Sequence, residues 1–229
     1  MNDVLALASD YDETLACQGR VDPPTWNALV QFKASGRKLI LVTGRELDDL
    51  LKVCGNLDVF DAVVVENGAV LYLPSNRRSI NLAGSPPVGF VEILRQRGVH
   101  PLSVGRSIVA TVRSQYEPLA QAIRELGLDM QVVFNRASLM ALPSGVNKRT
   151  GLQAALQQLR VAADRVVGIG DAENDEAFLS MCGLYAAVAN ALPPLKQAAD
   201  IITRHECGAG VVEIIEKIMA GQLSLALRQ

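Results

Sequence analysis

The sequence predicts an α/β protein with a Rossmann-like parallel-sheet core and an inserted α+β cap domain. Strand-sized apolar runs alternate with helical segments near both ends of the chain. In the middle, the pattern changes to helices that are each followed by a pair of strands. A chain of 229 residues with 49% apolar side chains is long enough to bury a substantial core, as one large domain or two smaller ones.

The first part of the core reads as three strands separated by two helices. Apolar runs at 4–8, 38–42 and 62–65 predict the strands, and the second is nearly continuous, as in sheets covered on both faces. A helix is expected at 24–35, because Pro23 and Pro24 stand at its start and Gly36 at its end. A second helix is expected at 46–54.

The last part of the chain repeats this alternation. Strands are expected at 166–169, 185–188 and 201–203, with helices at 152–159, 175–181 and 211–219. Strands that alternate with helices form parallel sheets with right-handed crossovers. The two ends of the chain therefore predict one open parallel sheet.

The middle of the chain predicts a separate small domain. Helices are expected at 88–97 and 117–126, and strands at 103–105, 107–112, 130–134 and 139–142. This αββαββ order, with short turns inside each pair, favours an antiparallel sheet with helices on one face. We expect a core made of 1–82 and 145–229, a cap at 83–144, and hinges near Pro86-Pro87 and 143–145.

Composition excludes several classes of partner. The formal net charge of −2 gives no basic field for nucleic acid or anionic lipid, and no apolar stretch approaches the length of a membrane span. The apolar run near the N-terminus ends at once in acids and does not read as a signal peptide. We therefore expect a cytoplasmic protein whose four scattered cysteines are reduced, with His100 and His205 outside any metal site.

Two carboxylates close the first strand, at Asp10 and Asp12. Side chains two residues apart on a strand point the same way, so these two charges repel unless a cation lies between them. Magnesium prefers oxygen ligands and suits such a position. A polar loop after a strand is the alternative interpretation of this segment alone.

Two further motifs offer groups that bind anions. Thr43-Gly44-Arg45 follows the second strand, where a hydroxyl and free backbone N–H groups at a helix start are able to hold a phosphoryl oxygen. Lys148, just before a predicted helix, could neutralise charge near a phosphate. Taken singly, these two motifs are explained better by an ordinary strand-to-helix turn and by a solvated surface lysine.

The segment 168–175 carries Asp171 and Asp175, four residues apart and hence on one face of a helix start. It lacks the third glycine of the dinucleotide fingerprint, and the chain contains no P-loop. A helix cap with an acidic first turn is the alternative. In open α/β sheets, however, ligands bind at the carboxyl ends of strands, which is where all four motifs fall.

In sequence order these motifs resemble the haloacid dehalogenase-like (HAD) hydrolase superfamily, specifically its Cof-type branch, subfamily IIB. D-x-D-x-T at 10–14, T-G-R at 43–45, E-N-G at 66–68, Lys148, G-D-x-x-N-D at 170–175 and the tail 198–203 all occur in family order. The insertion is similar to the small C2-type cap of archaeal-type phosphoglycolate phosphatases, which are relatives of sucrose-phosphate phosphatases. Two positions depart from the family, Glu13 and the segment 188–191, where relatives most often carry a glycine.

The resemblance implies a role for each motif. Asp10 would be the nucleophile that forms an aspartyl-phosphate, and Asp12 the general acid and base. Mg²⁺ would be held by Asp10, the Asp12 main-chain carbonyl and Asp171, with Asp175 acting directly or through a water. Thr43, the Gly44 N–H and Lys148 would bind phosphate oxygens. The remaining candidates for phosphate or substrate binding are Tyr11, Arg45, Asn67 and Asn174.

The resemblance also implies an activity. The chain would be a Mg²⁺-dependent phosphatase of a small phosphorylated metabolite, either a sugar phosphate or a phosphoglycolate-like acid, acting as a monomer or homodimer. The cap would be a lid, with Arg113 and Arg136 as candidate specificity residues. A sugar-phosphate mutase and a non-catalytic binding protein on the same scaffold are the alternatives.

Overall fold

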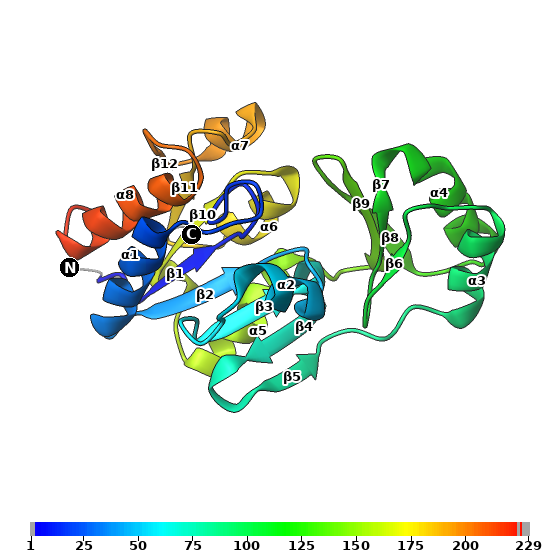
Figure 1. Ribbon diagram of the computed structural model, residues 1–229, viewed down its shortest axis with the longest axis horizontal. Coiled ribbons are helices and arrows are strands. Elements are labelled where there is room, and N and C mark those ends of the chain that lie inside the picture. Colours follow the sequence, from blue (N-terminus) through cyan, green and yellow to red (C-terminus); the bar gives the residue numbers. More distant parts are fainter. Residues whose placement is uncertain (1–2, 224, 226–229) are drawn as a thin grey trace.

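The computed structural model describes residues 3–223 and 225, and it contains two sheets that lie side by side (Figure 1). The larger sheet has eight strands and the smaller has four. Within the described residues, no helix is long and apolar enough to cross a membrane. The predicted fold class, an α/β core with an inserted α+β cap, is confirmed.

The core sheet has the order β12-β11-β10-β1-β2-β3-β4-β5. Its parallel strands are β1 (Ala6–Ser9), β2 (Lys38–Val42), β3 (Ala62–Val65), β10 (Val166–Gly170), β11 (Leu184–Ala187) and β12 (Ile201–Ile202). Every residue of β1, β3, β10 and β11 is buried, so both faces of the sheet centre are covered. A hairpin that we did not predict, β4 (Val70–Leu73) with β5 (Arg78–Asn81), extends one edge in antiparallel orientation.

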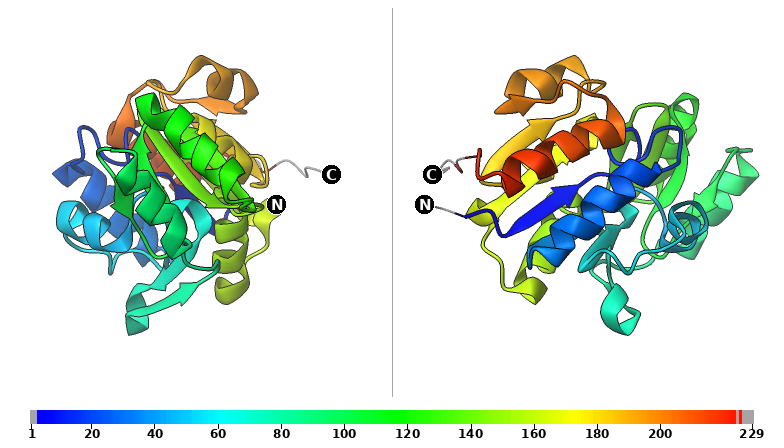
Figure 2. Two further views of the ribbon diagram at one scale, coloured as in Figure 1. Left: turned by 90° about the vertical axis from the view of Figure 1, so that its right-hand side faces the viewer. Right: turned by 60° about the vertical axis from the view of Figure 1, so that its left-hand side comes forward.

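Helices cover this sheet. They are α1 (Pro23–Ala34), α2 (Leu47–Cys54), α5 (Lys148–Leu159), α6 (Glu176–Leu179), α7 (Pro193–Ala198) and α8 (Cys207–Met219). Helices α1 and α8 pack against each other (Figure 2), and α5 packs against β2 and β3. The helix expected at 175–181 is a 3₁₀ turn, η5 (Glu173–Asp175), followed by the short α6. Helix α7 was not predicted.

Helix α5 starts four residues earlier than expected. The Asn147 side chain accepts a hydrogen bond from the Thr150 N–H, and the Thr150 hydroxyl accepts one from the Asn147 N–H. This reciprocal cap satisfies N–H groups that the first turn leaves unpaired. As a result, Lys148 is the first residue of α5 and lies at the carboxyl edge of the core sheet.

The smaller sheet belongs to the cap and has the order β6-β7-β9-β8, antiparallel throughout. Its elements are α3 (Val88–Gln96), β6 (Ser103–Val104), β7 (Val109–Val112), α4 (Tyr116–Glu125), β8 (Met130–Asn135) and β9 (Ser138–Pro143). This is the predicted αββαββ order. The cap has its own apolar cluster, which includes Phe90, Leu94, Leu119 and Leu139. The boundaries 83 and 144 stay a prediction.

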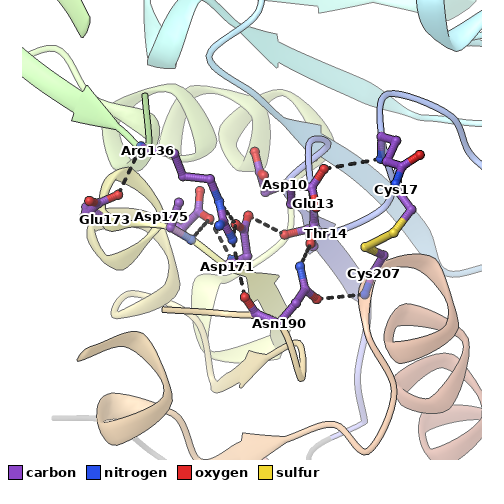
Figure 3. Close-up of polar contacts among 12 residues, drawn as sticks. Asp10, Glu13, Thr14, Cys17, Arg136, Asp171, Glu173, Asp175, Asn190 and Cys207 are labelled. Carbon is purple, nitrogen blue, oxygen red and sulfur yellow. Dashed lines mark hydrogen bonds and ion pairs between the residues drawn. A yellow bond between two sulfur atoms is a disulfide. The ribbon is translucent and has the colours of Figure 1, made fainter. Parts of the chain in front are cut away.

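A disulfide joins Cys17 to Cys207, whose Cα atoms are 5.6 Å apart although 190 positions separate them (Figure 3). The expectation that all four cysteines are reduced is therefore wrong for this pair, whereas Cys54 and Cys182 keep their thiols. The fold brings the loop after β1 onto the first turn of α8, where a Cβ on Gly208 would lie 2.9 Å from the Leu15 carbonyl. Sequence spacing could not show this contact.

Candidate active site

The predicted motifs meet at one edge of the core, at the carboxyl ends of β1, β2, β3 and β10 and the start of α5. Parallel strands end at a common edge, so side chains that follow each strand converge there. Asp10, Thr43, Asn67, Lys148, Asp171, Asn174 and Asp175 are all buried at this edge. The convergence that the sequence predicted is therefore present.

Lys148 is the centre of the cluster. Its Nζ atom lies 2.5 Å from Asp10 Oδ1 and 2.5 Å from Asp175 Oδ1, and the side chain is fully buried. A buried ion pair is maintained only when geometry and hydrogen bonding compensate the loss of hydration. One ammonium held between two carboxylates meets that condition and fixes the position of the Asp10 oxygen atoms.

The pKa values reflect the crowding of charge. Burial lowers the pKa of Lys148, but Asp10 and Asp175 raise it more, so the net pKa is above its usual range. Burial raises the pKa of Asp10 well above its ordinary value, and repulsion from Asp175 adds to this, against the opposing effect of Lys148. Burial and Asp175 also raise the pKa of Asp171. The cluster therefore holds more negative charge than Lys148 neutralises.

The three acids Asp10, Asp171 and Asp175 suit a divalent cation. Carboxylate oxygens from all three lie within 4.8 Å of one another (Figure 3). Such oxygen donors, buried and in excess of positive charge, are the ligands that Mg²⁺ takes. Asn174 adds a buried side-chain oxygen that has no hydrogen-bond partner among the described residues.

Asp175 has a second task. Its Oδ2 atom accepts hydrogen bonds from the N–H groups of Asp171, at 2.9 Å, and Ala172, at 3.0 Å. It therefore caps the turn η5, as the alternative interpretation of this motif held, and it also neutralises Lys148. Both of its oxygens are already engaged.

Asp12 lies apart from the three-acid cluster. Arg45 donates to both of its carboxylate oxygens, Nε to Oδ2 at 2.7 Å and Nη2 to Oδ1 at 2.8 Å. Arg45 also pairs with Asp49, and the hydrogen bonds that it donates to Asp12 raise the pKa of its guanidinium. We predicted Arg45 as a phosphate or substrate ligand, but here it binds the Asp12 carboxylate at the edge of a cavity.

The Tyr11 side chain packs against Arg45, whose Cζ atom lies 5.7 Å from the centre of the ring. Its ring is fully buried in the core, and its hydroxyl donates to the Gly19 carbonyl at 3.4 Å. Only the Tyr11 backbone is thus available to the site. Across the described residues, the N–H groups of Tyr11, Asp12 and Gly44 have no hydrogen-bond partner. Free N–H groups at two strand ends, together with the buried Thr43 hydroxyl, make a site for an anion.

The E-N-G segment, the 3₁₀ turn η1 (Glu66–Gly68), places Asn67 in this site. Asn67 has φ +53°, and its Oδ1 accepts a hydrogen bond from Asn174 Nδ2 at 3.0 Å. Gly68 has φ +106°, and a Cβ there would lie 1.9 Å from the Asn147 carbonyl. The glycine therefore lets the start of α5 approach, which brings Lys148 to Asp10.

Several contacts were not predicted. Thr14 donates to Asp171 Oδ1 at 2.9 Å, and Asn190 donates to the Glu13 carbonyl at 2.7 Å while accepting from the Cys207 N–H (Figure 3). Glu13 has φ +57°, a conformation that costs less for glycine, which the family most often has there. Thr14 was recognisable from D-x-D-x-T, whereas the Asn190 contacts depend on the fold.

The cap reaches the site through Arg136, in the turn between β8 and β9. Its Nε donates to Asp171 Oδ2 at 2.8 Å, and its Nη2 pairs with the same oxygen. Met140 of β9 lies against Gly44. A cavity of about 750 Å³ remains between core and cap, lined by Asp12, Gly44, Arg45, Thr111, Arg136 and Met140, among others.

This architecture and site define a hydrolase of phosphorylated compounds, and comparison with known proteins agrees. Residues 7–100 and 104–215 match the family described as haloacid dehalogenase-like hydrolase, and the chain belongs to it. The fold is that of subfamily IIB: a sugar phosphatase of that subclass has a TM-score of 0.76 at 17% identity, over 95% of this chain and 99% of its own. A haloacid dehalogenase-like hydrolase from Bacteroides thetaiotaomicron gives 0.79 at 20% identity, covering 93% and 98%.

Curated relatives extend the similarity along almost the whole chain. Phosphoglycolate phosphatase 2 from Saccharolobus solfataricus is 33% identical over 227 residues, which cover 96% of this chain and 94% of that protein. A phosphoglycolate phosphatase from Methanothermobacter thermautotrophicus is 27% identical over 222 residues, covering 93% and 98%. The chain is therefore a HAD-type phosphatase, a phosphoric monoester hydrolase with a cap domain, as the motifs predicted.

Metal should stabilise this protein more as pH rises. Asp10 and Asp171 have pKa values raised above those of the unfolded chain, so stability present at low pH is lost as pH rises through the folded-state values. A divalent cation held by these acids would require their ionised forms and would relieve their repulsion. We expect the Mg²⁺-induced increase in Tm to grow between about pH 5 and about pH 8. Thermal unfolding with Mg²⁺ or EDTA measures this, and an increase that is constant or largest at low pH contradicts it.

Proposed function

We propose that the protein hydrolyses a short phosphorylated acid, such as phosphoglycolate, in a Mg²⁺-dependent reaction through an aspartyl-phosphate. The observation that carries the proposal is the Asp10 carboxylate, fixed by Lys148 beside free N–H groups at a cavity that the cap closes. The names of the curated relatives support phosphoglycolate as the substrate.

Asp10 is the proposed nucleophile. Its Oδ1 atom is bound by Lys148, which leaves Oδ2 to attack phosphorus and expel the alkoxide of the substrate. The Tyr11, Asp12 and Gly44 N–H groups and the Thr43 hydroxyl would hold the phosphoryl oxygens, with Lys148 neutralising charge. Such electrostatic stabilisation supplies most of the catalysis in phosphoryl transfer.

Asp12 is the proposed proton donor to the leaving alkoxide and then the base that activates water. It has to be released from Arg45 before it takes up a proton, because a bidentate guanidinium stabilises the ionised form. We propose that substrate entry frees Arg45, which then contacts the substrate as the sequence predicted. The cavity beside Asp12 gives the arginine room to move.

Mg²⁺ would be held by the carboxylates of Asp10 and Asp171 and by the Asp12 main-chain carbonyl. When bound, it neutralises the charge that develops on the phosphoryl oxygens. Because both oxygens of Asp175 are engaged by Lys148 and two N–H groups, we favour its contribution through a water. Asn174, whose Nδ2 atom donates a hydrogen bond to Asn67 Oδ1, would lie beside the carboxylates that hold the metal.

The cap at 83–144 would act as a lid that admits substrate and then excludes water. Arg136 brings a guanidinium from the cap to the end of the cavity. Guanidinium groups bind carboxylates through paired hydrogen bonds. We propose that Arg136 exchanges Asp171 for the carboxylate of the substrate, which selects phosphorylated acids over neutral phosphate esters. We expect no nucleic-acid partner. Whether the protein is a monomer or a homodimer stays a prediction.

Replacing the nucleophile should abolish turnover. For Asp10→Asn we expect kcat to fall by at least about a thousandfold, because an amide does not attack phosphorus. The measurement is phosphate release from phosphoglycolate, sugar phosphates and nucleotides, with Mg²⁺ or EDTA. Asp58→Asn, the same change at an exposed position, should behave as wild type. Appreciable turnover by folded Asp10→Asn would remove Asp10 from the reaction.

Arg136→Gln should alter selectivity. At saturating Mg²⁺ we expect kcat/KM for phosphoglycolate to fall by about 10- to 100-fold, the cost of a lost charge-assisted pair, with little change for ethyl phosphate. The control is Arg95→Gln, which removes an exposed cap guanidinium on α3. An equal loss on both esters contradicts recognition of the carboxylate by Arg136.

A further inference from the structure

The glutamate of the E-N-G segment has no part in the chemistry proposed above, yet its side chain is buried. Glu66 follows β3, is 2% exposed and has φ +51°. A buried carboxylate is costly unless its oxygens are fully hydrogen-bonded. The partners of Glu66 therefore show what the residue does.

All three partners are backbone N–H groups of the cap. Glu66 Oε1 accepts from Arg106 at 2.9 Å, and Oε2 accepts from Ser107 at 2.8 Å and Ile108 at 3.2 Å. Consecutive N–H groups that converge on one point form a concavity that binds anions. No lysine or arginine of the described chain pairs with Glu66, so these N–H dipoles alone compensate its charge.

The cap turn is shaped to receive this carboxylate. A Cβ on Gly105 would lie 2.7 Å from Glu66 Oε2 and 2.8 Å from its Cδ. Any larger residue at position 105 would therefore clash with the Glu66 carboxylate. Ser107 also donates from its hydroxyl to the Ala83 carbonyl at 3.1 Å, so the same turn is tied to the segment that precedes the predicted hinge at Pro86-Pro87.

The contact lies beside an apolar cluster that spans core and cap. Ala69 of the core packs there with Ile108, Met140 and Leu142 of the cap. Low polarity around a carboxylate strengthens its hydrogen bonds, since water does not compete. Ile108 both donates to Glu66 and lines the cavity, so the contact sets the distance between the cap face and the site.

We propose that Glu66 is a positioning residue that latches the cap closed over the active site through the N–H groups of 106–108. Opening of the cap breaks three hydrogen bonds together and exposes a charge, and closing restores them. The latch is one residue from Asn67, so the closed cap and the phosphate site share the turn η1. This inference rests on the lid role proposed above and assigns the residue that holds the lid.

The test is Glu66→Gln, which keeps the shape but removes the charge and one acceptor oxygen. We expect the amide hydrogens of 106–108 to exchange with deuterium at least about tenfold faster, and kcat/KM to fall about tenfold, mainly through KM. Glu92→Gln, the same change on an exposed cap helix, should leave both unchanged. Exchange is measured without substrate, so it tests the latch even if no phosphate ester is hydrolysed.

A second pair of variants approaches the latch from the cap. Gly105→Ala should push the turn away from Glu66 and accelerate exchange at 106–108, whereas Gly89→Ala adds a methyl group in open space. These variants decide the matter if Glu66→Gln fails to fold. Exchange at wild-type rates in the folded variants overturns the proposal, as does faster exchange with unchanged kcat and KM on a hydrolysed substrate.

Discussion

The pairing of Lys148 with two buried carboxylates is the constraint on which the site depends. Without the ammonium, Asp10 and Asp175 would be like charges whose side chains have almost no exposure to solvent. Removing one partner of a buried ion pair costs about 3–5 kcal/mol, because the remaining charge is uncompensated. The fold therefore has to deliver Lys148 to one position, and much of the local structure serves that purpose.

The start of α5 shows how this is done. The reciprocal cap of Asn147 and Thr150 begins the helix at Lys148. Gly151 is packed so closely that a Cβ would lie 2.4 Å from Val64 and 2.6 Å from the Gly68 Cα atom. Glycines on both sides of the contact thus let helix and strand end approach. The E-N-G turn serves two purposes: Gly68 admits α5, and Glu66 receives the cap.

The sequence predicted much of the site because the features that form it are short polar motifs and periodic apolar strands, which are visible in the sequence. Apolar strands that each end in a polar motif have to bring those motifs together, so the meeting of Asp10, Thr43 and Asp171 followed from topology. Lys148 instead reaches them from the start of α5. Contacts that depend on tertiary geometry did not follow: Arg45 reaches Asp12, and Cys17 reaches Cys207, only in the folded chain. Prolines at the start of α7 and the turn at Pro74–Asn76 were readable signals that we did not use.

The central claim, that the Lys148 ammonium compensates the buried carboxylate of Asp10, is tested most directly by a double-mutant cycle. The measurement is the free energy of unfolding of wild type, Lys148→Met, Asp10→Asn and the double variant, in EDTA at about pH 8. We predict that Asp10→Asn stabilises the Lys148→Met protein by about 1–3 kcal/mol more than it stabilises the wild type, since only there is the carboxylate unpaired. An equal effect of Asp10→Asn in both backgrounds would contradict the account.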